Sequence, residues 1–571
     1  MGYTGGEALV EVLKQQEVKA IFSSPGSEWV PVWEALARLH AQGNQEPKYF
    51  NCRHEMLAAS AAIGYAQKGG GLPAVLFHSS TGLLHGAMAV RGAYKEQVPM
   101  LVFSGEAVRF TEDKDPKSGK DWQWLSSLSD VGGSSRMAAP FVKWSQAVTS
   151  RETLSATIAR ACQMARMAPQ GPVFLSVSKE YLQEELEEII PRMPVPRTYC
   201  TPDPDDMEKI AALLMDSRNP ILITERIGAQ PKAMEKLVEF AEALAIPVFE
   251  CMYQDYFNFP KEHPLHAGFD VTQAIREADV VLVVAATTPW NPQRTNPGPE
   301  ARVLIIDNQA PYYQAPFWNY RADMIVAADP LPALEALVDL VKGKSHNSAA
   351  DSDRFGYWKA RHDQLIASWD QDARRFRQKK PIDPNWLCYA VNESLPANAI
   401  VVRETITHTG AIKQYIRRIR PGNFYKGNVG GLGSGMGVAL GAKLASSGQP
   451  VVHLVGDGSF NYAPVLSALG FSQEYRLPVL TVVFNNGAYR AMKSGHLRLY
   501  PEGWALRNQT FYGVDIVPSP DYAQLMKAFD AYGEKVEDPG EITPALDRAW
   551  QEVRKGRSAL LDVVMDPEDP R

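Results

Sequence analysis

The sequence lacks the features that mark secreted, membrane-spanning or zinc-binding proteins. Its five cysteines are scattered over positions 52, 162, 200, 251 and 388, and no two of them form a CxxC pair. An odd, widely spaced set of this kind predicts reduced thiols and neither disulfides nor a zinc site. No run of 18 apolar residues is present, so we expect no membrane-spanning helix. The N-terminus has no basic region followed by an apolar core, so we expect no signal peptide and a cytoplasmic protein.

Basic charge is not in excess either. The chain carries 59 Lys and Arg residues against 65 Asp and Glu residues, a formal net charge of −6. This balance argues against nucleic acid or an anionic membrane as the main partner. Hydrophobic residues make up 45% of the chain and charged residues 22%, which is typical of a globular protein. At 571 residues the chain is too long for one hydrophobic core, and about three or four domains are expected.

Several catalytic and nucleotide-binding motifs are missing as well. The chain has no GxSxG nucleophile elbow, no Walker A loop and no HExxH pair. The glycine-rich segment Gly430–Gly437 follows a short extended stretch and opens an alanine-rich helix, but no register of it satisfies the dinucleotide pattern GxGxxG. Two interpretations of this segment remain open: a tight strand–helix turn, or a flat backbone shelf for a planar ring.

Apolar runs of strand length alternate with helical spacing along the whole chain. This alternation predicts parallel α/β sheets. Two breaks divide it: residues 191–204 hold five prolines, and residues 343–353 are small and polar, so both are predicted linkers. We therefore predict an α/β fold with three doubly wound parallel-sheet domains, at residues 1–190, 191–345 and 346–571.

Two predicted strand ends near the C-terminus carry an acid, an amide and bare backbone. One apolar run ends in Gly456-Asp457-Gly458, and the next ends in Asn485-Asn486. The 26 residues between Gly458 and Asn485 are enough for a crossover helix between parallel strands, whose ends then meet at one sheet edge. Oxygen ligands of this kind suit Mg²⁺, and glycines let backbone N–H groups approach a phosphate. The pattern predicts a Mg²⁺–diphosphate anchor.

Four other residues are candidates, each with an ordinary structural alternative. Glu55 begins an apolar helix, either as a carboxylate favoured by the helix dipole or as a carboxyl that holds and shares a proton. His78 ends a buried strand, either as a structural histidine or as an active-site group. Glu404 ends another strand, where a surface carboxylate is the favoured interpretation. Ser27 is a turn serine without a local partner for a catalytic triad.

The pattern from Gly456 to Asn486 resembles the thiamin diphosphate signature, in which GDG is followed by a crossover and NN. The likeness extends over most of the chain. Similarity to the pyrimidine-binding domain of benzoylformate decarboxylase is carried by Ser23–Glu28, Arg53–Glu55, Phe77–Gly82 and Met167–Val177. Similarity to its diphosphate-binding domain is carried by Gly430–Ala442 and Gly456–Tyr489. The chain thus resembles the family of benzoylformate decarboxylase, acetolactate synthase and related carboligases.

The resemblance implies a set of residues around a bound thiamin diphosphate. The implied metal ligands are Asp457, Asn486 and the backbone carbonyl of Ala488. The cofactor would further be held by Thr405, Ile406, Thr407, Ser434, Met436, Gly458, Ser459, Tyr462 and Tyr489. With the glycine-rich segment aligned on Met436, that side chain is the apolar wedge that bends the cofactor between its two rings. The Ser434 carbonyl then accepts from the aminopyrimidine.

The same resemblance implies catalytic roles for Glu55, His78 and Ser27. Glu55 would hydrogen-bond the pyrimidine ring nitrogen, so that the imino form of the 4′-amine removes the thiazolium C2 proton. The resulting ylid would attack a 2-oxo acid, and loss of CO₂ would leave an enamine that yields an aldehyde or, with a second carbonyl compound, an acyloin. His78 would act as general acid or base, and Ser27 would contact the substrate carboxylate.

In two places the chain departs from its relatives. Residues 286–294 correspond to a stretch that carries a second active-site histidine in benzoylformate decarboxylase, and they contain none. The residues that would fill its place are Trp290, Asn291 or Gln293. Slower protonation of the enamine would follow, which favours carboligation. Phe77 and His78 differ from the small residues found there in acetolactate synthases, so that specific activity is less favoured.

The resemblance also implies partners for the chain. Its cofactors would be thiamin diphosphate and Mg²⁺, whereas FAD, which some relatives bind in the middle domain, is not favoured. A small 2-oxo acid and an aldehyde or ketone acceptor would be the substrates, with neither nucleic acid nor membrane involved. Active sites would lie between the subunits of a homodimer or of a dimer of dimers, which is a homotetramer. Walls of the substrate pocket would come from Trp29, His85, Trp124 or the segment Leu497–Trp504.

Two other functions remain open from the sequence. One keeps the cofactor but acts as an acetolactate synthase, hydrolyses a C–C bond or transfers an acyl group. The other is a non-catalytic homologue that serves as a binding subunit. The joint presence of Glu55, Asp457 and Asn486 argues against the second, because a chain without catalysis has no physical need for all three.

Overall fold

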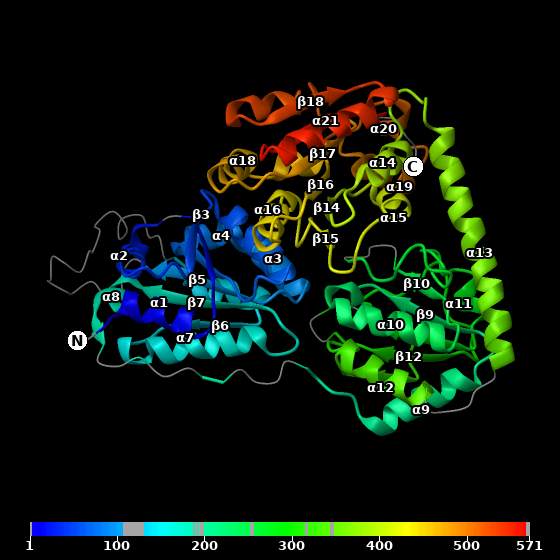
Figure 1. The fold of residues 1–571 in the computed structure, drawn as a ribbon, viewed down its shortest axis with the longest axis horizontal. Helices are drawn as coiled ribbons and strands as arrows, with labels where there is room; N and C mark the ends of the chain where they lie inside the picture. Colours follow the sequence, from blue (N-terminus) through cyan, green and yellow to red (C-terminus); the bar gives the residue numbers. More distant parts are fainter. Residues whose placement is uncertain are drawn as a thin grey trace.

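The computed structural model describes residues 3–24, 26–106, 131–186, 199–251, 256–312, 318–342 and 348–566, together with residues 189, 193, 194 and 315. These residues form three parallel α/β sheets, one in each predicted domain, which confirms the predicted fold class (Figure 1). The first domain lies beside the third, and the middle domain is joined to the third along one side (Figure 1). No helix in the described part of the chain is long and apolar enough to cross a membrane.

The first sheet has six parallel strands in the order β3-β2-β4-β5-β7-β6. Its strands are β2 (Ala20–Ser23), β3 (Lys48–Asn51), β4 (Ala74–His78), β5 (Met100–Glu106), β6 (Trp144–Ala147) and β7 (Pro172–Ser178), and a short antiparallel pair joins β1 (Tyr3–Thr4) to β8 (Glu185–Leu186). The helices are α1 (Gly5–Gln15), η1 (Ser27–Trp29), α2 (Val30–Ala41), α3 (Glu55–Gln67), α4 (Ser79–Lys95), α6 (Ser134–Ala138), η3 (Ala139–Phe141), α7 (Arg151–Arg166) and α8 (Lys179–Gln183). A capping box of Thr4 and Glu7 explains why α1 begins where it does.

The middle sheet has five parallel strands in the order β10-β9-β11-β12-β13. Its strands are β9 (Pro220–Thr224), β10 (Val248–Glu250), β11 (Val280–Val284), β12 (Arg302–Ile306) and β13 (Met324–Val326). The helices are α9 (Pro204–Asp216), η4 (Ile227–Ala229), α10 (Pro231–Ala243), α11 (Ala274–Glu277) and α12 (Pro330–Lys342). Strand β11 is all valine and leucine and is fully buried, as a central strand covered on both faces requires.

The third sheet again has six parallel strands, in the order β15-β14-β16-β17-β19-β18. Its strands are β14 (Ile400–Glu404), β15 (Phe424–Lys426), β16 (Val451–Gly456), β17 (Leu480–Asn485), β18 (Tyr532–Val536) and β19 (Ala559–Val564). The helices are α13 (Ser348–Arg375), α14 (Pro384–Ser394), α15 (Thr409–Tyr415), α16 (Gly435–Ala445), α17 (Asp457–Tyr462), α18 (Val465–Glu474), α19 (Arg490–Leu499), α20 (Trp504–Arg507), η5 (Tyr522–Phe529), η6 (Pro539–Glu541) and α21 (Ile542–Arg554).

The first and third sheets share one topology. In each, the chain starts on an inner strand, β2 or β14, steps outward to β3 or β15, and then crosses back to build the other side from β4 or β16. The strand order therefore reverses between β2 and β4 and between β14 and β16. Open α/β sheets bind ligands at the carboxyl ends of strands at such a reversal. The fold itself thus marks two edges as binding sites.

Close helix packing joins the first domain to the third. Helix α3 crosses α16, and a methyl group on Gly437 would collide with the Ser60 hydroxyl, while one on Gly441 would collide with the Ala61 carbonyl. The two helices can approach this closely only because these α16 positions carry no side chain. The contact fixes the sheet edges of both domains relative to each other within one chain.

Helix α13 corrects one predicted linker. Residues 343–353 were expected to form a polar linker, but α13 already begins at Ser348 and continues to Arg375. The helix runs along the middle domain toward the third domain (Figure 1). Its Arg354 donates to the carbonyl oxygens of Leu244 and Ala245, which follow helix α10 of the middle domain. Small polar residues allowed a helix here because tertiary contacts of its later turns stabilise it.

Two buried lysines join the middle domain to the third domain. Lys261 donates from Nζ to the carbonyl oxygen of Lys413 at 2.7 Å, and Lys413 donates from Nζ to the carbonyl oxygen of Cys251 at 2.6 Å. Both residues are 1% exposed, and their Nζ atoms lie 5.2 and 4.5 Å from the ring centre of Phe269. Burial lowers the pKa of Lys261 to about 8 and that of Lys413 to about 7, although the Glu250 carboxylate opposes both shifts.

Candidate active site

The carboxyl edge of the third sheet brings Asp457 and Asn486 together. Asp457 follows β16 directly and begins α17, while Asn486 follows β17, the neighbouring strand. Asp457 accepts from the backbone N–H of Gly458 through Oδ1 at 2.8 Å and from that of Gly487 through Oδ2 at 2.7 Å. The carboxylate is thus held in place by the turns that follow both strands, as the spacing of the two motifs predicts.

Oxygen atoms converge beside this carboxylate. One terminal atom of the Asn486 amide lies 3.0 Å from the Ala488 carbonyl oxygen and 3.1 Å from Asp457 Oδ1. When the amide oxygen takes this place, three oxygens from Asp457, Asn486 and Ala488 face one another. Hard cations such as Mg²⁺ take this kind of donor set, a carboxylate with amide and backbone oxygens. The residues present therefore fit a divalent cation.

Burial shapes the electrostatics of the same point. It raises the pKa of Asp457 to about 6, and the nearby Asp562 carboxylate adds to the shift, while backbone N–H donors oppose it. Asp562 is itself buried and accepts from Asn485 Nδ2 at 2.8 Å, so it supports the second strand end from behind. A concentration of buried negative charge of this kind is stabilised by a cation.

The residues expected at the diphosphate surround the start of α17. Gly458 and Ser459 lie in its first turn, and a methyl group on Gly458 would come within 2.8 Å of the Tyr489 ring. The rings of Tyr462 and Tyr489 have their centres 6.2 Å apart, and Tyr462 is 60% exposed. Backbone N–H groups at a helix start attract anions, so this arrangement suits a phosphate.

The segment after β14 faces the same strand reversal. Thr405 is buried, its carbonyl accepts from the Thr409 hydroxyl at 2.7 Å, and Ile406 is 46% exposed. Ile406 and Thr407 thus form the tip of the loop between β14 and α15, whereas Thr405 anchors it. All three predicted residues lie at the reversal between β14 and β16.

Glu404 is not a surface carboxylate, contrary to the favoured interpretation of the sequence. It is fully buried, and it accepts backbone N–H bonds from Gly433 at 2.7 Å, Ser434 at 3.0 Å and Gly435 at 2.9 Å. A carboxylate at this place satisfies the unpaired donors of the first turn of α16 and interacts favourably with the helix dipole. Glu404 therefore decides where α16 begins.

The start of α16 bears on two residues expected to contact the cofactor, Met436 and Ser434. Met436 lies inside the helix and is 6% exposed in the hydrophobic core, so it does not line the open edge. The Ser434 carbonyl accepts from the Val438 N–H at 3.1 Å as part of the helix, and the Ser434 hydroxyl donates to the Gly427 carbonyl at 2.6 Å. The partly exposed apolar side chain of the loop is Leu432, four residues earlier.

The carboxyl edge of the first sheet carries Glu55. Glu55 is the first residue of α3, which His54 caps by accepting from the Met56 N–H at 3.1 Å. Its side chain is 11% exposed, and Oε2 lies 3.3 Å from Nδ1 of His85. His85 in turn stacks on His54 with ring centres 5.6 Å apart. Burial lowers the pKa of His54, against the opposing effect of Glu55.

His78 and Ser27 lie at the strand reversal of the same sheet. His78 ends β4, and Ser27 begins η1 after β2 and is exposed. Sequence reasoning missed Glu28, which follows Ser27 in the chain and contacts His78. His78 Nδ1 lies 3.0 Å from Oε2 and 3.1 Å from Oε1 of Glu28, whose side chain is 1% exposed. The sequence signals for Glu28 are its place at the end of the segment Ser23–Glu28 and next to Ser27, in the turn after a buried strand.

The predicted residues thus fall into two groups on two sheets. Glu55, His78 and Ser27 lie at the carboxyl edge of the first sheet, and Asp457 and Asn486 lie at that of the third. One group offers carboxyl, imidazole and hydroxyl, which handle protons, and the other offers an anchor for a cation and a phosphate.

Models of one family match all three domains. The N-terminal TPP binding domain of thiamine pyrophosphate enzymes matches residues 3–121, the central domain matches residues 207–337, and the C-terminal TPP binding domain matches residues 406–563. The chain belongs to the thiamine pyrophosphate enzymes. Thiamine pyrophosphate and thiamin diphosphate are two names for one compound, so the predicted family is confirmed.

Relatives of this thiamine pyrophosphate enzyme include synthases and decarboxylases. The large subunit of acetolactate synthase isozyme 3 from Escherichia coli is 25% identical, over 99% of this chain and 95% of the relative. Benzoylformate decarboxylase from Pseudomonas aeruginosa is 23% identical, over 85% of this chain and 86% of the relative. A solved thiamine diphosphate-dependent 4-hydroxybenzoylformate decarboxylase from Rhodococcus jostii has the same fold, with a TM-score of 0.79 at 23% identity and full coverage of both chains.

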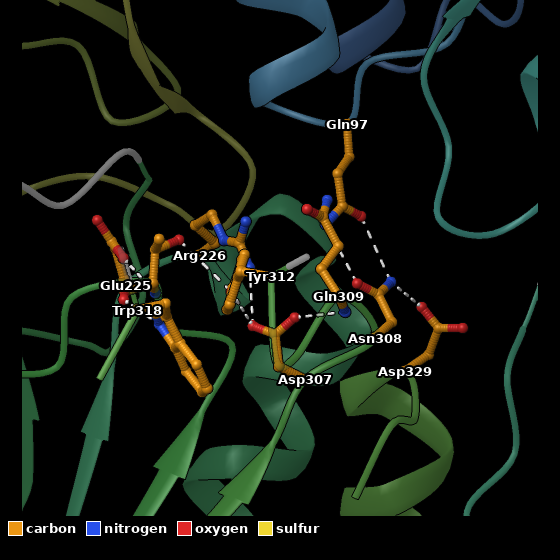
Figure 2. Close-up of polar contacts among 10 residues, drawn as sticks. Gln97, Glu225, Arg226, Asp307, Asn308, Gln309, Tyr312, Trp318 and Asp329 are labelled. Carbon is orange, nitrogen blue, oxygen red and sulfur yellow. Dashed lines mark hydrogen bonds and ion pairs between the residues drawn. The ribbon is translucent and has the colours of Figure 1, made fainter. Parts of the chain in front are cut away.

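In this thiamine pyrophosphate enzyme, side chains of the middle domain bind one another across the carboxyl edge of the middle sheet (Figure 2). Arg226 donates from Nη2 to Asp307 at 2.8 Å and to the Tyr312 hydroxyl at 2.8 Å. Gln97 of the first domain donates to Asn308 at 3.1 Å. A cavity of about 270 Å³ lies beside these groups, between the two domains. The preference against FAD at this edge stays a prediction.

Three of the four predicted pocket walls lie within the described residues. Trp29 is fully buried and donates from Nε1 to the Phe77 carbonyl at 2.9 Å, so it belongs to the core of the first domain and not to a pocket wall. His85 has a side chain that is 60% exposed and sits beside Glu55. Residues 497–504 carry exposed apolar groups, among them Trp504 at 73%. Trp124 lies outside the described residues.

Proposed function

We propose that this thiamine pyrophosphate enzyme is a Mg²⁺-dependent decarboxylase or carboligase of 2-oxo acids that releases an aldehyde or an acyloin. The observation that carries the proposal is His78, which lies with Ser27 and Glu55 at one sheet edge and pairs with a buried carboxylate. A 2-oxo acid needs a group for its carboxylate and a group that exchanges protons, and this edge has both.

The cation and the diphosphate would be held by the third domain. Asp457, Asn486 and the carbonyl of Ala488 are the proposed Mg²⁺ ligands, because their oxygens converge. Gly458 and Ser459 would bind the diphosphate through the first turn of α17, with Tyr462 and Tyr489 beside it. When bound, thiamin diphosphate supplies an electron sink for the carbanion that remains after CO₂ leaves.

The rings of the cofactor would be held by the glycine-rich loop and by Glu55. Because Met436 lies inside α16, we assign the apolar wedge to Leu432 and the carbonyl acceptor, two residues earlier, to Gly430, whose oxygen also accepts from Arg91 at 3.3 Å. Ile406 and Thr407 would line the other side of the strand reversal. The buried Glu55 would share a proton with the pyrimidine ring, while His85 holds its other side.

Two side chains of the first domain would handle the substrate. His78 would deliver or remove the proton at the reacting carbon, a role worth roughly 10²–10⁴-fold in rate. Ser27 would donate its hydroxyl to the substrate carboxylate. Residues 286–294 hold no histidine that could share this role: Trp290 is buried and donates its N–H to Asn296 at 3.3 Å, and the exposed Asn291 and Gln293 carry amides that do not titrate. Slow protonation favours attack on a second carbonyl compound, and hence carboligation.

The proposed function includes a site that is shared between two chains. The proton-handling group and the cation-holding group occupy separate sheet edges of one chain. We propose that the first domain of one subunit faces the third domain of a second, in a homodimer or a dimer of dimers. This arrangement supplies Glu55 and Asp457 to one cofactor from two subunits.

Product analysis tests the proposed function. The purified chain would be incubated with thiamin diphosphate, Mg²⁺ and a panel of 2-oxo acids that includes pyruvate and benzoylformate, and CO₂, aldehyde and acyloin would be measured. We expect cofactor-dependent CO₂ release that is lost in Glu55→Ala, with acyloin as a main product. Near-exclusive aldehyde would refute the carboligase preference, and acyl transfer without CO₂ would support the acyl-transferring alternative. Absence of cofactor binding would refute both.

A further inference from the structure

We propose that Glu28 is a positioning residue that keeps the imidazole proton of His78 on Nδ1, so that Nε2 is the nitrogen that exchanges a proton with the substrate. This role rests on the proposed function, which makes His78 the acid–base group. It assigns a task to a residue that the sequence analysis gave no role.

The two residues meet across the strand reversal of the first sheet. Glu28 lies in η1 directly after β2, and His78 is the last residue of β4. His78 Nδ1 lies 3.0 and 3.1 Å from the two oxygens of Glu28. The Glu28 side chain is 1% exposed, whereas that of His78 is 31% exposed. The imidazole is therefore held from inside the protein and is accessible from the site.

The carboxylate determines where the imidazole proton sits. An ionised carboxylate only accepts hydrogen bonds, so the nitrogen that faces Glu28 must carry a proton. In the neutral ring Nε2 is then a base, and in the charged ring Nε2–H is an acid whose charge Glu28 balances. A buried carboxylate that orients a histidine in this way is also the third member of hydrolase triads.

A purely structural role for Glu28 is the competing explanation. Its Oε1 also accepts from the Ser79 N–H at 3.1 Å, at the start of α4. A methyl group on Gly26 would collide with both Glu28 oxygens and with His78 Nδ1, so the pair is tightly enclosed. Glu28→Gln separates the two roles, because glutamine has nearly the same volume and keeps an oxygen for Ser79 but removes the negative charge.

The first test measures the titration of His78 in the full purified chain. Diethyl pyrocarbonate acylates neutral imidazole, and mass spectrometry of the His78 peptide at several pH values gives the midpoint. We expect this midpoint to move to lower pH in Glu28→Gln, whereas the exposed His40 keeps its own. Two other titratable residues lie near the pair: Tyr49, which interacts with the charge of Glu28, and Glu106 on the adjacent strand β5. Both are still present in Glu28→Gln, so a moved midpoint reports the loss of the Glu28 charge.

A matched control is Glu7→Gln, which removes a carboxylate of the same domain that pairs with Arg38 far from β4. It should leave the His78 midpoint as in the wild type. An unmoved His78 midpoint in Glu28→Gln overturns the proposal, as does an equal shift in the control.

The second test is kinetic and uses the 2-oxo acid that the wild type turns over best. We expect kcat of Glu28→Gln to fall by roughly 10²-fold, with a smaller change in KM and a displaced pH profile, because a misplaced acid–base group loses most of its contribution. A wild-type kcat and pH profile would contradict the role. If the wild type shows no cofactor-dependent turnover, the proposed function fails, while the acylation experiment still decides whether Glu28 controls His78.

Discussion

Lys413 Nζ lies 2.6 Å from the carbonyl oxygen of Cys251, so the helix that follows the proposed cofactor loop is tied to the middle domain. Lys413 belongs to α15, which begins at Thr409, two residues after Thr407. Burial lowers its pKa from the ordinary 10.5 to about 7. The folded chain therefore binds fewer protons here than the unfolded chain, and the stability from this group is lost as the pH falls from 10.5 toward 7.

We predict that this lysine makes stability depend on pH. Between about pH 7 and 9 the melting temperature of the wild type should rise with pH, and Lys413→Met should flatten that rise, because methionine has no proton to bind. Differential scanning fluorimetry at several pH values measures both slopes. Lys527→Met, which changes an exposed lysine of the same domain, should keep the wild-type slope. Equal slopes in Lys413→Met and the wild type would contradict the prediction.

We predict that Asp457→Asn weakens Mg²⁺-dependent binding of thiamin diphosphate by about 100-fold or more, because one of three converging oxygens loses its charge. Titration calorimetry with and without Mg²⁺ measures the effect. Asp538→Asn, in the same domain and paired with the surface residue Lys380, serves as control and should bind as the wild type does. If Asp457→Asn and Asp538→Asn bind thiamin diphosphate with equal affinity in the presence of Mg²⁺, Asp457 is not a ligand of the cation.

Leu432→Ala and Met436→Ala should fail in different ways. Met436 fills the core of α16, so its truncation should cost about 2–5 kcal/mol of unfolding free energy. Leu432 is partly exposed in the loop, so its truncation should leave the melting temperature nearly unchanged and weaken cofactor binding. Urea unfolding and cofactor titration of both variants check this pair. If Leu432→Ala binds the cofactor with wild-type affinity, Leu432 is not the apolar wedge.

Mixing two inactive variants tests whether the site is shared between subunits. Glu55→Ala and Asp457→Asn should each be inactive alone. If each site combines Glu55 of one chain with Asp457 of another, co-refolded or co-expressed chains should regain about a quarter of wild-type activity, since half of the random dimers are mixed and each holds one intact site. Activity that stays at the level of the single variants would place both residues of one site in one chain.

The fold and the two anchor motifs are predictable because they depend on local patterns. Apolar runs that alternate with helical spacing indicate parallel sheets, and strand ends with Asp457 and Asn486 need only a crossover of suitable length. Glu28 is different, since its partner His78 is 50 residues away along the chain and only the strand order brings them together.

The register of the glycine-rich loop is also beyond sequence reasoning. Loop composition alone does not show where α16 begins. The carboxylate of Glu404, about 30 residues upstream, decides it by capping Gly433, Ser434 and Gly435. The expectation that Met436 is the wedge therefore follows a plausible alignment but misses a long-range cap. Trp29 fails as a pocket wall for a similar reason, because its contact with the Phe77 carbonyl spans 48 residues.

The matching strand orders of the first and third sheets give the chain an internal pseudo-symmetry. Under it, β4 corresponds to β16 and β2 to β14, so His78, which ends β4, and Asp457, which follows β16, lie at the ends of equivalent strands. Under the proposed function, one scaffold is used twice within the same polypeptide, once to carry a proton and once to hold a cation. Substitutions after β2 and β4 would then act on the substrate, while β16 and β17, which precede the proposed cation ligands, stay untouched. Under the proposed function, the groups around the substrate can therefore vary separately from those that hold the cation.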